Sequence, residues 1–465
     1  MGLSKRPLDL FDPTLSPGTI IWALAWPTIV EQILQVTVTF ADSAMVGALG
    51  EQATAAISVT SSTIWLVNGW MNALALGFGV LMARDLGAGK QDRAKLVVRQ
   101  ALLTAMGFGL FLALIFMQIS RILPSWIGAE EAVRPLSQRY LFIIALGYVP
   151  NLLMITVSTL LRLSGDTKRP LYLNAFNNAC NILFNLFFIF PSIRIGRLLL
   201  PGLGLGVSGA AMATTLACSL TAILLLLVLF KGNHKIRISF RQRWAFDGQI
   251  QKQALKLGVP IALERSTLSF GQIALTKMVG ALGTTALAAH FLAISAESIT
   301  YLPASGFSTA ATTLVAQSLG REDKVLAKRY ANLCVLWGTV MMSLMGLVLY
   351  LFAPFLMMLF TRVEPVIILG AQVLRIEAFA QPAFGLSILV FGVMRGGGDT
   401  KGPFLISLVG MWLLRLPLAW ILLRLTSLGL AAVWLAMMSD LMLRGVICLY
   451  SYKKGSWLRS WQQPH

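Results

Sequence analysis

Long apolar runs are the feature of this chain that most limits how it can fold. A bilayer offers no water to backbone amides, so an apolar run long enough to cross it must be a helix. These runs account for the 57% of hydrophobic residues among 465, more than a single soluble core needs. We therefore predict an all-α membrane protein with twelve transmembrane helices. The predicted spans lie near 19–45, 53–83, 96–118, 140–161, 171–190, 208–230, 257–277, 286–316, 330–353, 366–393, 404–423 and 429–450.

Basic residues are concentrated in the gaps between these runs. Of the 38 Lys and Arg side chains, 26 fall in the gaps that share a side with the two chain ends, and 7 fall in the opposite gaps. Because Lys and Arg stay on the cytoplasmic side, we expect a multi-pass protein of the cell membrane with both termini in the cytoplasm. The net charge of +19 then reflects topology and contact with anionic membrane lipids, and no nucleic-acid partner is expected.

The second half of the chain repeats the first at an offset of 233 residues. The sequence MVGALG occupies 45–50 and again 278–283, and GDTKRP at 165–170 corresponds to GDTKGP at 398–403. Each copy holds six spans, so both copies enter the membrane from the same face and form a parallel repeat. We expect the glycines of both motifs to make turns between helices. The predicted parts are an N-terminal six-helix bundle at 1–230, a cytoplasmic linker at 231–256, and a C-terminal six-helix bundle with a cytoplasmic tail at 257–465.

Asp42 is a charged residue inside a span that does not follow the repeat, because Leu275 stands at the equivalent position. A charge within a span costs about 2.5–3.5 kcal/mol on insertion scales, so it should face a cavity or a partner. Asp42 lies in the outer part of the first span, and Gln35 lies two turns earlier on a similar face. This pattern predicts a cation or proton acceptor at Asp42.

The fifth span carries five asparagines on one face, within an arc of about 100°. Their amides would be costly against lipid, so the face must lie against protein or water. The equivalent positions in the second half are mostly apolar, which limits this polar stripe to the first bundle. The asparagines are Asn174, Asn177, Asn178, Asn181 and Asn185.

Glu31 and Glu264 do follow the repeat, each about one turn after a proline, Pro27 or Pro260. A proline frees a backbone carbonyl one turn before it, and an acid close to that carbonyl is suited to bind a cation or proton. The alternative interpretation is a carboxylate that is hydrogen-bonded to a neighbouring helix. The sequence leaves both open.

The second bundle has polar residues of its own. His290 and Glu297 are seven residues apart on one helix face, where the first half has isoleucines, and we predict that they line the second bundle. Asp440 and Arg444 are spaced for a local ion pair. Arg415 has no partner by spacing, and Glu377 or an anionic ligand are its candidates.

Motifs for other chemistry are weak. The chain has three histidines, no acid–His–nucleophile cluster and no CxxC, so we expect neither an enzyme nor a zinc site. The loops are too short for a nucleotide-binding domain. Transport is therefore expected to depend on an ion gradient and on no cofactor beyond the transported ion.

Several stretches together resemble the multidrug and toxic compound extrusion (MATE) transporters over nearly the whole chain, including their DinF-like branch. They are Pro27 through Asp42 into MVGALG, LGAGK, LRLSGDTKRP, PIALE, GTTALAAH, LVAQSLG and MRGGGDTKGP.

The resemblance implies two lobes around a central cavity that opens alternately to each face, and export of organic, often cationic, compounds against entry of H+ or Na+. In the archaeal and DinF-like branch a first-helix Asp and fifth-helix polar residues form the ion site. Asp42 and Asn181 match these, while Asn185 stands where several relatives have a second Asp. Another branch uses a seventh-helix Glu, which Glu264 resembles. A Na+ site at Asp42 and Asn181 or at Glu264 is thus implied, and the choice between H+ and Na+ stays open.

We accordingly expect a monomeric secondary active antiporter for small organic substrates. The alternative is a lipid or lipid-linked oligosaccharide flippase of the same superfamily, although these usually carry more spans. The expected ion-coupling residues are Asp42, Asn181 and Asn185. The expected substrate-cavity residues are Gln35, Asn174, Asn177, Asn178, Glu31, Glu264, His290 and Glu297.

Overall fold

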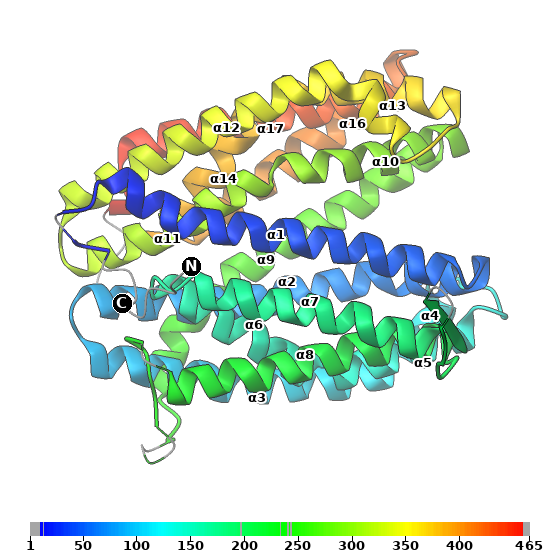
Figure 1. Ribbon diagram of the computed structural model, residues 1–465. Helices are drawn as coiled ribbons and strands as arrows, with labels where there is room; N and C mark the ends of the chain where they lie inside the picture. The colour runs from blue at the N-terminus through cyan, green and yellow to red at the C-terminus, as the bar shows by residue number, and fades with distance from the viewer. Residues whose placement is uncertain are drawn as a thin grey trace. The chain divides into compact units, whose positions relative to one another are not determined.

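The computed structural model describes residues 10–458, apart from 13, 196–197, 233, 240 and 242–243. This part of the chain is helical except for loops and one short antiparallel hairpin, in which β1 (Ser192–Ile195) pairs with β2 (Leu198–Pro201). The prediction of an all-α membrane fold is confirmed, and the hairpin lies in the loop after the fifth predicted span (Figure 1).

The first half of the chain contains eight helices among the described residues. They are α1 (Pro17–Gly47), α2 (Glu51–Gly87), α3 (Gln91–Ile119), α4 (Leu123–Trp126), α5 (Arg134–Leu146), α6 (Tyr148–Leu163), α7 (Lys168–Ile189) and α8 (Gly206–Lys231).

The second half continues with α9 (Gly248–Gly280), α10 (Thr284–Thr300), α11 (Leu302–Gly320), α12 (Lys324–Met358), α13 (Glu364–Ala378), α14 (Gln381–Gly396) and α15 (Lys401–Leu408). A π-helix, η1 (Val409–Arg415), leads into α16 (Leu416–Leu425), which is followed by α17 (Leu430–Lys454) and a 3-10 turn, η2 (Ser456–Leu458).

Seven helices in the described part of the chain are long and apolar enough to cross a membrane. Two bent pairs raise the number to nine if each pair is one span, namely α5 with α6 at 49° and α13 with α14 at 57°. Pro150 and Pro382 stand in the first turn after each bend and cannot donate the backbone hydrogen bond that would continue the preceding helix. The remaining predicted spans correspond to α7, to α9, and to α10 with α11, which are more polar or shorter.

The backbone repeats at the turns that the sequence predicts. Gly50 and Gly283 end the two MVGALG motifs with φ of 102° and 101°, and Gly165 and Gly398 of the two GDTK motifs have φ of 98° and 80°. A side chain is strained in this region of φ, which explains glycine at all four positions. The turn function predicted for both motifs is confirmed.

The contacts divide the described chain into two units. Unit 1 contains Val30–Asp85 and Lys90–Gly258, and unit 2 contains Leu10–Ile29, Leu86–Gly89 and the chain from Val259 onward. The boundaries therefore fall inside α1 and α9, beside Pro27 and Pro260. Each of these two helices contributes its first part to one unit and its second part to the other.

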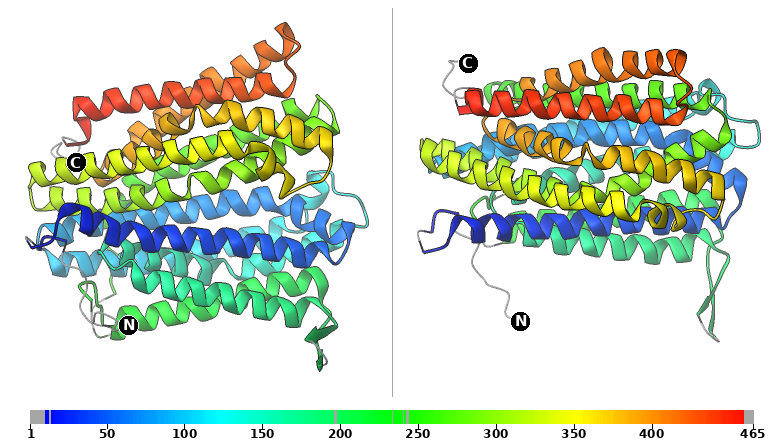
Figure 2. Two further views of the ribbon diagram at one scale, coloured as in Figure 1. Left: turned by 45° about the horizontal axis from the view of Figure 1, so that its top comes forward. Right: turned by 90° about the horizontal axis from the view of Figure 1, so that it is seen from above.

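In unit 1, α7 and α8 lie side by side along most of their length (Figure 1, Figure 2). Gly209 of α8 makes this approach possible, because a Cβ atom there would lie 2.4 Å from the backbone oxygen of Phe188. In unit 2, a core around Trp434 and Leu374 joins α9, α10, α12, α13, α16 and α17. These two assemblies position the polar residues described next.

Candidate functional site

Asp42 lies in a polar cluster of unit 1 that is built from α1, α7 and α8. The Nδ2 atom of Asn185 donates to Asp42 Oδ1 at 2.6 Å and to Asn181 Oδ1 at 3.2 Å. The Nδ2 atom of Asn181 donates in turn to Thr214 Oγ1 at 3.1 Å. Tyr140 of α5 lies within electrostatic reach of Asp42. Three predicted residues thus meet, and Thr214 and Tyr140 complete the cluster.

The asparagine stripe reaches a second acid at its other end. Asn174 Nδ2 donates to Glu31 Oε1 at 2.5 Å. The residues in the pairs Asn174–Glu31 and Asn185–Asp42 are both 143 positions apart, so α1 and α7 run parallel with one register over three helical turns. The stripe therefore connects the two carboxylates of α1 along a single helix interface.

The middle of the stripe is less tightly bonded. Asn177 Oδ1 accepts from Thr221 Oγ1 of α8 at 3.3 Å. Asn178 is half-buried and Gln35 is exposed, and neither side chain bonds to another described residue. Their amides are free to contact a ligand.

Glu31 and Glu264 form the same ion pair in the two units. Arg162 Nη1 lies 2.7 Å from Glu31 Oε1, and Arg395 Nη2 lies 2.8 Å from both carboxylate oxygens of Glu264. Each arginine follows its glutamate by 131 residues, so the repeat has preserved acid and partner together. Both carboxylates are buried and already balanced by a charge of opposite sign.

His290 is buried in unit 2 against a tryptophan. The indole Nε1 of Trp434 lies 3.1 Å from His290 Nδ1. An indole N–H can only donate, so Nδ1 accepts and the imidazole is neutral with its proton on Nε2. Glu297, two turns further along α10, is also buried.

Arg415 has a partner that its spacing did not predict. Its Nε donates to Asp440 Oδ2 at 2.7 Å, and Arg444 Nε donates to Asp440 Oδ1 at 2.6 Å. The predicted Asp440–Arg444 pair is confirmed and extended to a triad. Gly410 in η1 leaves room for it, because a Cβ atom there would lie 2.0 Å from Asp440 Oδ1. The wider π-helical turn changes the direction of Arg415, which no α-helical spacing shows.

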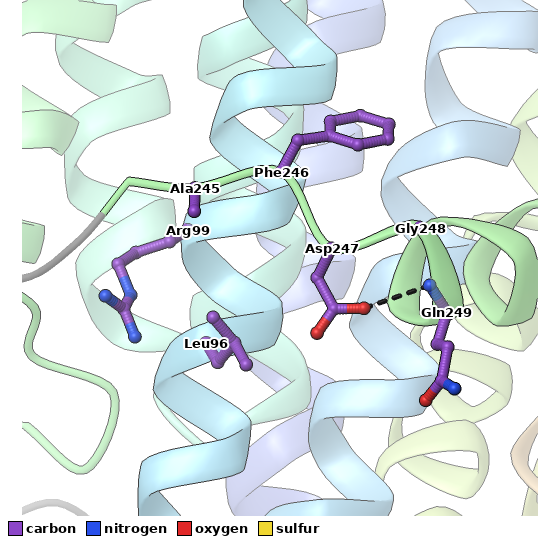
Figure 3. A pocket seen from close by; sticks show the side chains of 7 residues that line it. All are labelled: Leu96, Arg99, Ala245, Phe246, Asp247, Gly248 and Gln249. Carbon is purple, nitrogen blue, oxygen red and sulfur yellow. Dashed lines mark hydrogen bonds between the residues drawn. The ribbon is translucent and has the colours of Figure 1, made fainter.

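A separate cavity of about 560 Å³ lies in unit 1 beside the linker between α8 and α9 (Figure 3). Gln100 of α3 attaches the linker, because its Nε2 donates to the backbone oxygen of Ala245 at 2.7 Å and its Oε1 accepts from the backbone of Asp247 at 3.0 Å. Arg99 and Asp247 line the cavity, together with Leu96, Ala245, Phe246, Gly248 and Gln249. None of the predicted site residues lies there.

The described residues contain no group of three or more His, Cys, Asp or Glu side chains that could hold a metal ion. The Asp42 cluster can instead take one positive charge, because it offers a carboxylate and the unpartnered Oδ1 of Asn185. Thr214 and Tyr140 were not predicted because the sequence alone does not show which apolar helices face α7.

Comparison with known proteins shows the family. The MatE family matches residues 27–187 and again residues 260–421, and the two matches begin 233 residues apart. The chain belongs to the MatE family. The resemblance found in the sequence and the internal duplication are thereby confirmed, and MatE proteins are membrane transporters, not enzymes.

Relatives of this MatE protein match along nearly its whole length. A "Probable multidrug resistance protein NorM" from Thermotoga maritima is 27% identical over 93% of this chain and 92% of its own length. The "Uncharacterized transporter YisQ" of Bacillus subtilis is 22% identical over 98% of this chain and 97% of its own.

Solved structures show the same fold. A MOP superfamily transporter from Pyrococcus furiosus has a TM-score of 0.88 at 21% identity, and the match covers 96% of this chain and 97% of the other. A structure described as the outward-facing conformation of a multidrug resistance MATE family transporter has the same TM-score, identity and coverage.

Proposed function

We propose that this MatE transporter is a secondary active antiporter that exports organic, mainly cationic, compounds in exchange for H+ or Na+ by alternating access. The names of its NorM relatives support multidrug efflux as the activity. Asp42 is the proposed ion-coupling group, and Asn181 and Asn185 hold its carboxylate.

The observation that carries the proposal is the setting of Asp42. It is a half-buried carboxylate in an apolar helix, and its bond to the amide of Asn185 is neutral. An intramembrane charge without a counter-charge is costly, so a proton or Na+ is favoured there. Binding of either cation neutralises the site, and its release restores the negative charge.

The other predicted residues divide by their bonding. Gln35, Asn177 and Asn178 keep polar atoms available, and we assign them to substrate contact. Asn174, Glu31, Glu264 and His290 are engaged within their own units, so we assign them to support of the helices that carry the site. Glu297 is treated separately below.

The proposed topology has twelve spans with both termini in the cytoplasm, in a monomer surrounded by membrane lipid. Support comes from the helix lengths, since α7 has 22 residues and α9 has 33. A helix of about 20 residues crosses the hydrocarbon core. The helices α10 and α11 follow each other with one residue between them and supply the remaining span.

Transport in reconstituted vesicles tests the function. Vesicles are loaded with a fluorescent organic cation, and a pH gradient or a Na+ gradient is imposed separately at a clamped membrane potential. We expect one gradient to drive movement of the cation against its own concentration gradient. Movement driven by neither gradient would contradict the proposal, as would translocation of a labelled lipid in place of the cation.

A further inference from the structure

Unit 2 contains a buried cluster of ionisable side chains that the proposed function does not use. It lies where α10, α13, η1 and α17 meet, and Arg415 is at its centre. The charge of Arg415 acts on His290, Glu297 and Glu377, in addition to its direct bond with Asp440.

Asp440 is fully satisfied within this cluster. It accepts Nε of Arg415 at 2.7 Å, and Nε and Nη2 of Arg444 at 2.6 Å each. Its residue exposure is zero. This acid is therefore ionised and held by two guanidinium groups.

Glu377 is buried just as deeply but has no such partner. Its exposure is zero, and neither Oε1 nor Oε2 accepts a hydrogen bond from a described residue. An ionised carboxylate in that position would lack every compensation that buried charges normally have.

Glu297 shares its environment. Thr300 Oγ1 of α10 lies 3.2 Å from Gln381 Oε1 at the start of α14. Thr300 is one turn after Glu297, and Gln381 is one turn after Glu377, so this bond brings together the helix faces that carry the two acids. The acids act on each other electrostatically. Glu297 is 9% exposed and Glu377 is not, so Glu297 is the member that is open to exchange.

The charges of the cluster do not balance without one more positive charge. Arg415 and Arg444 are positive, whereas Asp440, Glu297 and Glu377 would all be negative. His290 is neutral because it accepts the indole N–H of Trp434.

Other nearby charges do not supply the balance. Glu264 is matched by Arg395, and Arg265 and Lys277 of α9 are exposed. Arg375 on α13 lies over the ring of Tyr350 of α12, and Tyr301 adds no charge. One negative charge is therefore in excess.

We propose that Glu297 and Glu377 form a second proton-binding site, in which the two carboxyl groups share one proton that enters and leaves through Glu297. Two close carboxylates in an apolar site hold one proton between them as a single unit. A proton fits better than a metal cation, since the described residues offer no group of three acid, His or Cys ligands. The site is independent of the Asp42 cluster in unit 1.

Infrared spectroscopy of the full-length protein in lipid tests the site at neutral pH. All samples carry Asp42→Asn, so that Asp42 contributes no carboxylic acid. We expect a carboxylic-acid C=O band that shifts in heavy water and is absent in both Glu377→Gln and Glu297→Gln. Either substitution removes the excess negative charge, so the remaining carboxylate no longer needs a proton.

Thermal unfolding of the same variants provides a second readout. Each single variant should unfold within a few degrees of its parent. The double variant should unfold at a clearly lower temperature, because its cluster has one positive charge in excess. A band that persists in either single variant would overturn the proposal, as would a double variant as stable as the singles or a parent band that Na+ abolishes.

Discussion

At the scale of single residues, the two units keep one pair of charges and differ in another. The glutamate–arginine pair occurs in both, as Glu31–Arg162 and Glu264–Arg395, whereas Asp42 has only Leu275 as its counterpart. A residue present in both halves serves the common architecture. A residue present in one half is a better candidate for a function that only one half performs.

The repeated ion pairs lead to a stability prediction. Glu264→Gln leaves Arg395 buried without a counter-charge and should lower the free energy of unfolding by about 3 kcal/mol. Glu31→Gln should cost less, because its side chain is 11% exposed and that of Glu264 is 4% exposed. Thermal unfolding in detergent measures both, and Glu264→Gln/Arg395→Gln should recover part of the loss. Equal stability of Glu264→Gln and wild type would contradict the assignment.

His234 in the linker leads to a pH prediction. Its Nε2 bonds to the backbone oxygen of Val228 at 2.8 Å, and desolvation by burial lowers the pKa of the imidazole below its ordinary value. The unfolded segment then binds more protons than the folded one, so stability rises with pH up to about 6.5 and falls below it. Hydrogen exchange at the end of α8 should accelerate on acidification, and His234→Gln should remove this dependence. An unchanged pH profile in the variant would be inconsistent with this role.

How much of the site could be predicted also depends on single residues. Asp42 and the asparagines could be found because polar residues in an apolar run are conspicuous. Both members of the Glu–Arg pairs recur at the same offset, but their contact crosses 131 residues and cannot be seen in the sequence. Arg415 had no predictable partner because a π-helix sets its direction.

At the scale of elements, the α7–α8 pair positions the ion site. The bond between Asn181 and Thr214 requires the close approach that Gly209 permits. The helices themselves could be predicted from apolar runs, but the bends between α5 and α6 and between α13 and α14 could not. Apolar content continues through each bend, and only the two prolines distinguish it.

A matched pair of glycine variants tests this packing. Gly209→Ala should destabilise unit 1, because the added Cβ atom lies 2.4 Å from the backbone oxygen of Phe188. Gly107→Ala in α3 has nothing within 4 Å and should gain about 0.5–1 kcal/mol of helix stability. Thermal unfolding of the two variants should therefore shift in opposite directions. A shift in the same direction would show that α7 and α8 do not pack this closely.

At the scale of the whole molecule, the basic linker and the loop before α8 should lie on opposite sides of the membrane. Ser239 and Leu203 are both exposed, and the four native cysteines are buried. In intact cells, an impermeant thiol reagent should label Leu203→Cys from outside and should label Ser239→Cys only after the membrane is opened. The reverse pattern would contradict the proposed cytoplasmic side.

Ion coupling through Asp42 is the central claim, and gradient-driven efflux from reconstituted vesicles tests it most directly. Wild type, Asp42→Asn and Asp92→Asn are compared, with Asp92 as an exposed acid at the start of α3. The account predicts that Asp42→Asn loses at least about tenfold of the gradient-driven rate, equivalent to about 1.4 kcal/mol. Asp92→Asn should match wild type. Undiminished gradient-driven efflux in Asp42→Asn would contradict the account.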